Sequence, residues 1–176
     1  VKRPIYIDST TIMLGGNNIV YFNATELNPK LKIVIPRNLK HVYAKSLVFI
    51  SDTLYFSNNK QLNKVIRFKE EAYPTSFAPS DQQRIFSIAL NGNQIYISTL
   101  KTVYKLEQDT LIPVESFVNT PFRKFQFFQG VLVGITHDYQ LIVGFPTSKE
   151  NQFRIQIILE DCSWMDMNYI FHSNVL

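Results

Sequence analysis

The chain has 176 residues, 45% of them hydrophobic, which is enough for one folded domain with a sizeable core. Its formal net charge of +4 is weaker than the concentrated basic stripe of a dedicated nucleic-acid binder, and its single cysteine, Cys162, excludes a fold held by intrachain disulfides. No apolar run of about 18 residues could cross a membrane, and the N-terminus lacks the apolar core of a signal peptide. We therefore expect an intracellular protein, cytoplasmic or nuclear, without a membrane partner.

A short phrase recurs along the chain: an apolar run, a polar turn, and a second apolar run that carries Tyr or Phe. Its copies cover residues 12–22, 47–56, 95–106 and 131–145, and a shorter fifth copy covers residues 168–176. The centres of the turns lie about 36, 48, 38 and 35 residues apart, which is in the period range of propeller blades. Each unit holds three or four strands, and it can bury both faces of its sheet only by stacking against a neighbour.

This pattern predicts an all-β fold, a β-propeller or partial propeller of about four to five short blades. A β-trefoil is the alternative, because its units have a similar length, although it uses three of them. We treat residues 1–176 as a single β-repeat domain or as a fragment of a larger propeller. The fifth copy either closes a ring with residues 4–7 or belongs to an unfinished blade.

Segments rich in Asn, Pro, Ser and charge separate the copies, and we predict loops at residues 23–30, 57–64, 72–83 and 145–152. The apolar runs at residues 31–35 and 153–159 are expected to be outer strands that complete their units. Residues 63–71 could form two helical turns, but their content fits a strand over residues 64–68 equally well. With only 6 glycines in the chain, Asn and Asp must supply positive φ in many turns.

The second copy, together with its flanks, resembles a divergent RCC1-type repeat over residues 41–62, HVYAKSLVFISDTLYFSNNKQL. In that family a blade runs from an apolar strand through a short turn to a Val-Tyr-aromatic strand, and then to a Gly-Asn-rich segment that ends in Gln-Leu. Here residues 54–56 and 58–62 follow that order, and residues 136–145 are similar in their first half. The resemblance implies a propeller that binds partner proteins and, in some relatives, chromatin or a small GTPase.

Residues with catalytic or metal-binding chemistry are scattered. His41, His137 and His172 stand one per unit, and no HxH, HExxH or CxxC pattern is present, so we predict turn-capping histidines, no metal site and no cofactor. Cys162 has acidic neighbours and no nearby Lys or Arg to activate it, which favours a buried structural thiol. The strands expected to be innermost, within residues 48–51, 95–98 and 131–136, are apolar or hydroxylic. We therefore assign no catalytic residue and predict that the protein is not an enzyme.

Basic residues precede the inner hairpin of each of the first four units, and equivalent positions in a radial array lie on one rim. Such a basic face would bind an acidic surface or nucleic acid, whereas the simpler interpretation is ordinary charge on solvated loops. Lys2 and Arg3 stand before the first hairpin, and the residues that we assign to this predicted basic face are Arg37, Lys40, Arg84, Arg123 and Lys124.

We predict a non-enzymatic protein-protein interaction scaffold, a propeller subunit or domain of a larger complex whose partners are other protein subunits. One alternative is a nucleic-acid or chromatin-associated binding module that uses the basic face, and a second is a propeller-type hydrolase or lyase. The aromatic cluster that includes Phe122, Phe125 and Phe127 is predicted to form core between blades rather than a platform for stacking bases.

Overall fold

The computed structural model describes residues 5–6, 11–14, 19–23, 25, 32–34, 47–51, 53–66, 75–149 and 151–162. These residues form four antiparallel sheets of four strands each, and the strands of every sheet follow one another in chain order. The chain divides into two compact units, Val1–Ile88 and Ala89–Leu176, with the boundary inside a strand. The expectation of a single domain over residues 1–176 stays a prediction.

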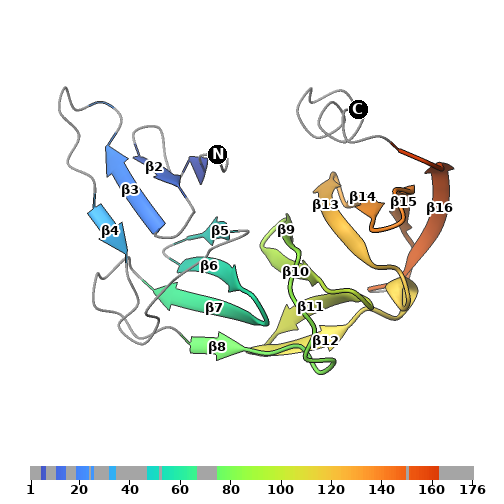
Figure 1. Ribbon diagram of the computed structural model, residues 1–176, viewed down its shortest axis with the longest axis horizontal. Coiled ribbons are helices and arrows are strands. Elements are labelled where there is room, and N and C mark those ends of the chain that lie inside the picture. The colour runs from blue at the N-terminus through green and yellow to red at the C-terminus, as the bar shows by residue number, and fades with distance from the viewer. Residues whose placement is uncertain are drawn as a thin grey trace. The chain divides into compact units, whose positions relative to one another are not determined.

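The first unit contains the first and second sheets (Figure 1). The first sheet consists of β1 (Ile5–Tyr6), β2 (Thr11–Leu14), β3 (Ile19–Asn23) and β4 (Lys32–Val34). The second sheet consists of β5 (Leu47–Ile50), β6 (Thr53–Asn58), β7 (Gln61–Ile66) and β8 (Thr75–Phe77). In the second sheet Asn63 is buried, and its amide oxygen accepts a hydrogen bond from the hydroxyl of Ser76 at 2.8 Å. This hydrogen bond between side chains holds β8 against β7.

The second unit contains the third and fourth sheets. The third sheet consists of β9 (Ser87–Asn91), β10 (Gln94–Ser98), β11 (Val103–Glu107) and β12 (Thr110–Pro113). A single turn of 3₁₀ helix, η1 (Glu115–Phe117), leads to the fourth sheet. The fourth sheet consists of β13 (Phe122–Phe128), β14 (Val131–Thr136), β15 (Leu141–Pro146) and β16 (Phe153–Leu159).

The recurring phrase does not mark the same two strands in every sheet. It covers the second and third strands of the first, third and fourth sheets, but in the second sheet it covers β5 and β6, the first and second strands. The turns between second and third strands are centred near residues 16, 59, 100 and 138, so their spacings are about 43, 41 and 38 residues. The spacing of the structural repeat is therefore more even than the spacing of the recurring sequence phrase.

Several expectations about individual segments are confirmed and others are wrong. Strands β4 and β16 are the fourth strands of their sheets, as expected, and β7 confirms the strand alternative for residues 64–66, while residues 67 and 68 lie outside the described residues. The loop expected over residues 57–64 is wrong, because those residues form the end of β6, a tight turn and the start of β7. The loop expected over residues 72–83 contains β8. The fifth copy of the phrase lies outside the described residues.

Of the three strands expected to be innermost, the one within residues 48–51 falls in β5, the first strand of its sheet, and the other two are placed differently. An innermost strand must lie at the edge of its sheet, whereas residues 95–98 and 131–136 belong to β10 and β14, the second strands of their sheets. The first strands of these two sheets, β9 and β13, lie one strand earlier in the chain. They were missed because the polar and charged residues within them interrupt the apolar run.

Asn and Asp supply many of the turns, as the scarcity of glycine predicts. Among the described residues, five with positive φ are of these types: Asn59, Asp109, Asn119, Asn151 and Asp161. Their short polar side chains can bond to nearby backbone, which lowers the cost of the left-handed conformation. Glutamine, serine and tyrosine occupy the remaining non-glycine positions of this kind.

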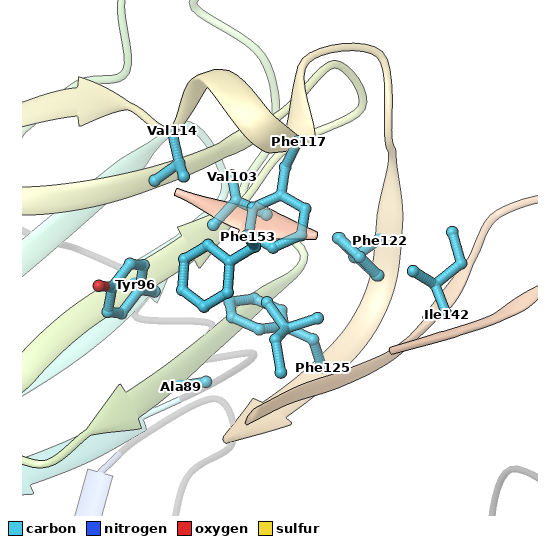
Figure 2. Close-up of a cluster of buried hydrophobic side chains, with 10 residues drawn as sticks. Ala89, Tyr96, Val103, Val114, Phe117, Phe122, Phe125, Ile142 and Phe153 are labelled. Carbon is cyan, nitrogen blue, oxygen red and sulfur yellow. The ribbon is translucent and has the colours of Figure 1, made fainter. Parts of the chain in front are cut away.

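The core of the second unit is an aromatic cluster that joins the third and fourth sheets (Figure 2). Phe117, from η1, packs its ring 5.0 Å from that of Phe153 and 5.6 Å from that of Phe122. Phe127 lies 4.7 Å from Tyr96 of the third sheet, measured between ring centroids. The expectation that Phe122, Phe125 and Phe127 form core is confirmed, since Phe122 and Phe125 are almost fully buried and Phe127 packs against the cluster.

Gly134 of β14 lies against the Phe122 ring and the Cβ of Phe125. A Cβ at this position would come within 2.5 Å of the Phe122 ring and 2.9 Å of the Phe125 Cβ. Both distances are shorter than van der Waals contact, so only glycine fits without displacing the rings. Gly144 of β15 is less confined, because its Cβ would meet the Phe117 ring at 3.0 Å.

Replacing Gly134 with alanine is expected to lower the free energy of unfolding by about 1–3 kcal/mol, because the added methyl overpacks the aromatic cluster. Urea denaturation followed by circular dichroism measures this change. Gly144→Ala should cost less, and Val118→Ala, at a position that is 56% exposed, should stay within about 0.5 kcal/mol. A Gly134→Ala protein as stable as the wild type would contradict the packing described for β14.

Candidate functional site

Arg123 lies at an irregular point of β13. Phe122 pairs with Thr136 and Lys124 pairs with Ile135, so Arg123 is the extra residue of a β-bulge between β13 and β14. A bulge interrupts the alternation of side chains along a strand and re-aims the residues beside it. It lets Phe122 and Phe125, three positions apart, both reach the aromatic cluster.

The turn between β14 and β15 carries Tyr139 in an uncommon backbone conformation. Its φ of 61° is in the left-handed region, where a bulky side chain costs about 1–2 kcal/mol. Hydrogen bonds hold the turn: the Tyr139 amide donates to the Thr136 carbonyl at 3.2 Å, and the Cys162 amide donates to the Tyr139 carbonyl at 2.7 Å. The Gln140 amide donates to the Thr136 hydroxyl at 3.1 Å.

The bulge and the turn bring Arg123 and Tyr139 together. The guanidinium carbon of Arg123 lies 5.6 Å from the centroid of the Tyr139 ring, and its Nη1 donates to the Tyr139 hydroxyl at 3.1 Å. Tyr139 is 42% exposed, so this contact is at the surface. A cation over an aromatic face is attracted by the ring quadrupole, and the hydroxyl bond adds a direction. Together the two contacts fix the guanidinium in one orientation.

His137 completes this group of side chains. Its pKa is lowered from the ordinary value, first by burial and second by the positive charge of Arg123, while Asp138 opposes the change. The imidazole is therefore neutral at pH 7. The His137 amide donates to the Pro121 carbonyl at 2.9 Å, which ties the turn to the start of β13. We call the surface formed by Arg123, His137, Asp138 and Tyr139 the Arg123–Tyr139 surface.

The other residues of the predicted basic face are not brought into this surface by any described contact. Arg84 is exposed in the loop before β9, in the first unit, with its guanidinium 5.7 Å from the Phe86 ring centroid. Lys124 follows Arg123 in β13 and is half-buried. Arg37 and Lys40 lie outside the described residues. The basic face as a set therefore stays a prediction.

Tyr139 is the residue of this surface that sequence reasoning missed. Its left-handed conformation has no sequence signal, because tyrosine is not a residue type that favours positive φ. The two phenylalanines three positions apart, Phe122 and Phe125, were a usable signal for the bulge. Two large aromatic residues at odd spacing cannot both face a core from one regular strand.

The surface offers hydrogen bonds and charge for binding. Arg123 donates a hydrogen bond to the Tyr139 hydroxyl, and a guanidinium is a group whose planar geometry matches a carboxylate or a phosphate. Among the residues that the structure describes, no group of three or more His, Cys, Asp or Glu side chains could hold a metal ion. No helix in the described part of the chain is long and apolar enough to span a membrane.

Cys162 is buried, as expected for a structural thiol. It is 1% exposed and packs with Ile135 and Leu141 of the fourth sheet. Its amide supports the Tyr139 turn, as described above, so its position matters to the surface through the backbone rather than through the sulfur.

No protein-family model and no curated protein matches the sequence. Among solved structures, the WD40 β-propeller domain of Doa1 superposes with a TM-score of 0.66 at 11% sequence identity, over 86% of this chain and 52% of that chain. The chain has a β-propeller fold. Each four-stranded sheet is one propeller blade, and the trefoil alternative is set aside.

Two further structures support the propeller fold. The extracellular domain of BT4673, a putative one-component system of B. thetaiotaomicron, matches with a TM-score of 0.64 at 16% identity, over 90% of this chain and 22% of that one. A chain of the nidogen/laminin complex matches with a TM-score of 0.59 at 15% identity, over 86% and 62%. This chain spans about half of the Doa1 domain and a smaller part of the BT4673 domain. No family model supports the RCC1-type resemblance, which stays a prediction.

Replacing Arg123 with glutamine is expected to raise the pKa of His137, because removing a nearby positive charge makes protonation of the imidazole easier. Proton NMR titration of the histidine rings measures this, with a His137→Gln variant to assign the resonance. Arg154→Gln is the matched control, since Arg154 also lies over a ring, that of Phe145, at 5.5 Å. An unchanged His137 pKa in the Arg123→Gln protein would contradict the proximity described.

Proposed function

We propose that the protein is a non-enzymatic interaction scaffold, a propeller module of a larger assembly, and that it holds an acidic segment of a partner protein on the Arg123–Tyr139 surface. The observation that carries the proposal is the fixed Arg123 guanidinium, aimed by a bulge and held by Tyr139. Arginine and tyrosine are two of the residue types that contribute most at protein interfaces. A side chain that is already ordered loses less conformational entropy on binding.

The local charges favour a protein partner over nucleic acid. A carboxylate can form two parallel hydrogen bonds with one guanidinium. A nucleic-acid backbone is instead bound by several cations that follow successive phosphates. Within the Arg123–Tyr139 surface His137 is neutral and Asp138 is acidic, so Arg123 is its one cation, which suits a single carboxylate better than a run of phosphates.

Propeller chains among the similar structures fit this role in general terms. The nidogen/laminin structure contains two different proteins in one complex, and its matching chain shares this fold. The likeness supports a scaffold function without naming a partner for this chain.

Charge reversal at Arg123 tests the proposal. Proteins that co-purify with the full chain are identified by mass spectrometry, and the affinity of a purified one is measured by calorimetry. Arg123→Glu is expected to weaken binding by at least about 30-fold, the size of an interface hot spot. Lys149→Glu, at an exposed position between β15 and β16, makes the same charge change and should leave the affinity unchanged.

Two further variants separate the alternatives. Tyr139→Gly relieves the left-handed strain, so the fold should be retained while binding falls about tenfold through loss of the ring. Arg84→Glu should have no effect unless the whole predicted basic face takes part. Binding that is unchanged by Arg123→Glu would overturn the proposal, and so would a nucleic-acid ligand whose affinity falls steeply with salt.

A further inference from the structure

Three exposed apolar side chains lie at one end of the two sheets of the second unit. Leu100, in the turn between β10 and β11, is 45% exposed, and Tyr139, in the turn between β14 and β15, is 42% exposed. Val118, which is 56% exposed, follows η1 in the connection from β12 to β13. The registers place this connection at the end of the sheets that carries both turns, because β12 ends beside the start of β11 and β13 starts opposite the end of β14.

Hydrogen bonds tie the connection to both turns. Near its start, the Val114 amide donates to the Val103 carbonyl at 2.8 Å, just after the turn that carries Leu100. At its other end, its Pro121 carbonyl accepts the hydrogen bond from the His137 amide in the Tyr139 turn. The three apolar side chains therefore stand on successive loops that are bonded in series. We call Leu100, Val118 and Tyr139 the apolar row.

The backbone around Val118 holds this side chain at the surface. The preceding residue, Phe117, is buried in the aromatic cluster (Figure 2). The Thr120 amide donates to the Phe117 carbonyl at 3.0 Å, which closes a turn with Val118 at φ −59° and ψ 130° and Asn119 at φ 62°. These are the angles of a type II turn, whose first central position accepts most residue types. The turn therefore does not require an apolar side chain at Val118.

The turn that carries Leu100 is also held by other residues. The Thr99 hydroxyl accepts hydrogen bonds from the amides of Lys101 at 3.2 Å and Thr102 at 3.3 Å. The Thr99 amide donates to the Thr102 carbonyl at 2.9 Å. None of these hydrogen bonds uses the Leu100 side chain, and polar residues are the usual choice in exposed turns. Leu100 and Val118 are thus apolar at positions where the fold does not need it.

The charges around the apolar row limit what can bind to it. Its neighbouring cations are Lys101 and Arg123, and both are accessible. Exposed carboxylates belong to the same loops and to the segment after β16, at Glu115, Asp138, Glu160 and Asp161. The last of these is next to Cys162, whose amide is bonded to the Tyr139 carbonyl. A run of acidic residues would be repelled here, whereas a single carboxylate can pair with Arg123.

We propose that the apolar row and Arg123 together bind one extended segment of a partner protein. In this segment a single Asp or Glu pairs with Arg123, and apolar residues on one side of it lie on Val118 and Leu100. One exposed ion pair contributes little affinity, so burial of apolar side chains supplies most of the remainder. The inference rests on the proposed function and specifies the sequence that the partner presents.

Selection from a phage-displayed library of random peptides, with the full chain as bait, tests the inference. Peptides of about 12 residues span up to about 40 Å when extended, which is long enough to cross several loops. The enriched peptides should share a single acidic residue with Leu, Ile, Val or Phe on one side of it. A consensus that lacks apolar residues, a consensus with several acidic residues, or no enrichment at all overturns the inference. A consensus without an acidic residue overturns the proposed function itself.

Variants of the chain then separate the two claims, with the affinity for an enriched peptide measured by calorimetry. Leu100→Ser and Val118→Ser should each weaken binding about five- to tenfold, because each removes part of an apolar contact. Ile155→Ser is the matched control, since Ile155 is 36% exposed in the middle of β16, and it should leave the affinity unchanged. Circular dichroism should show the same thermal transition for all three variants, because exposed positions contribute little to stability.

Arg123→Glu completes the set. If Arg123→Glu weakens binding while Leu100→Ser and Val118→Ser do not, the apolar row is wrong and the proposed function stands. If none of the variants changes the affinity, both are overturned. A loss of binding in Ile155→Ser equal to that in Val118→Ser overturns the placement of the segment on the apolar row.

Discussion

The aromatic cluster of the second unit is the constraint on which its other features depend. Successive contacts link Phe117, Phe122, Phe125, Phe127 and Phe153 into a closed circuit, with ring centroids 5.0 to 6.0 Å apart. Each such ring pair contributes about 0.5–1.5 kcal/mol beyond the burial of its area. A single four-stranded sheet cannot bury both of its faces, so this cluster is what makes two neighbouring blades one folded unit.

The Arg123–Tyr139 surface and the exposure of β16 both follow from the layout of that cluster. Phe122 and Phe125 can enter it together only because Arg123 occupies a bulge, and the bulge aims Arg123 at the turn that carries Tyr139. At the other side of the sheet, Phe153 is fixed by its ring contacts and by its amide, which donates to the Ser116 hydroxyl at 2.8 Å. The residues of β16 after Phe153 lie beyond the aromatic cluster, and the isoleucines among them are exposed.

The sequence was sufficient for the fold class and for most strands, because apolar runs and polar turns follow from local chemistry. It was insufficient for the register of the repeat: the phrase at residues 47–56 looks like the others but starts one strand earlier. From the sequence, Arg123 was recognisable only as a basic residue, and its contact with Tyr139 was not. Its geometry depends on a bulge that tertiary packing imposes, and Tyr139 depends on a turn whose conformation contradicts the preference of its residue type.

The conformation of Tyr139 itself is an argument for function. In the part of the chain that the structure describes, the other non-glycine residues with positive φ are Asn, Asp, Gln and Ser, and Tyr139 is the aromatic one. Glycine at this position would remove the strain at no cost to the hydrogen bonds of the turn, which are made by backbone groups and by Thr136. Backbone strain of this kind clusters at functional sites. Within the described contacts, the tyrosine side chain does what glycine could not: it holds the guanidinium of Arg123 at the surface.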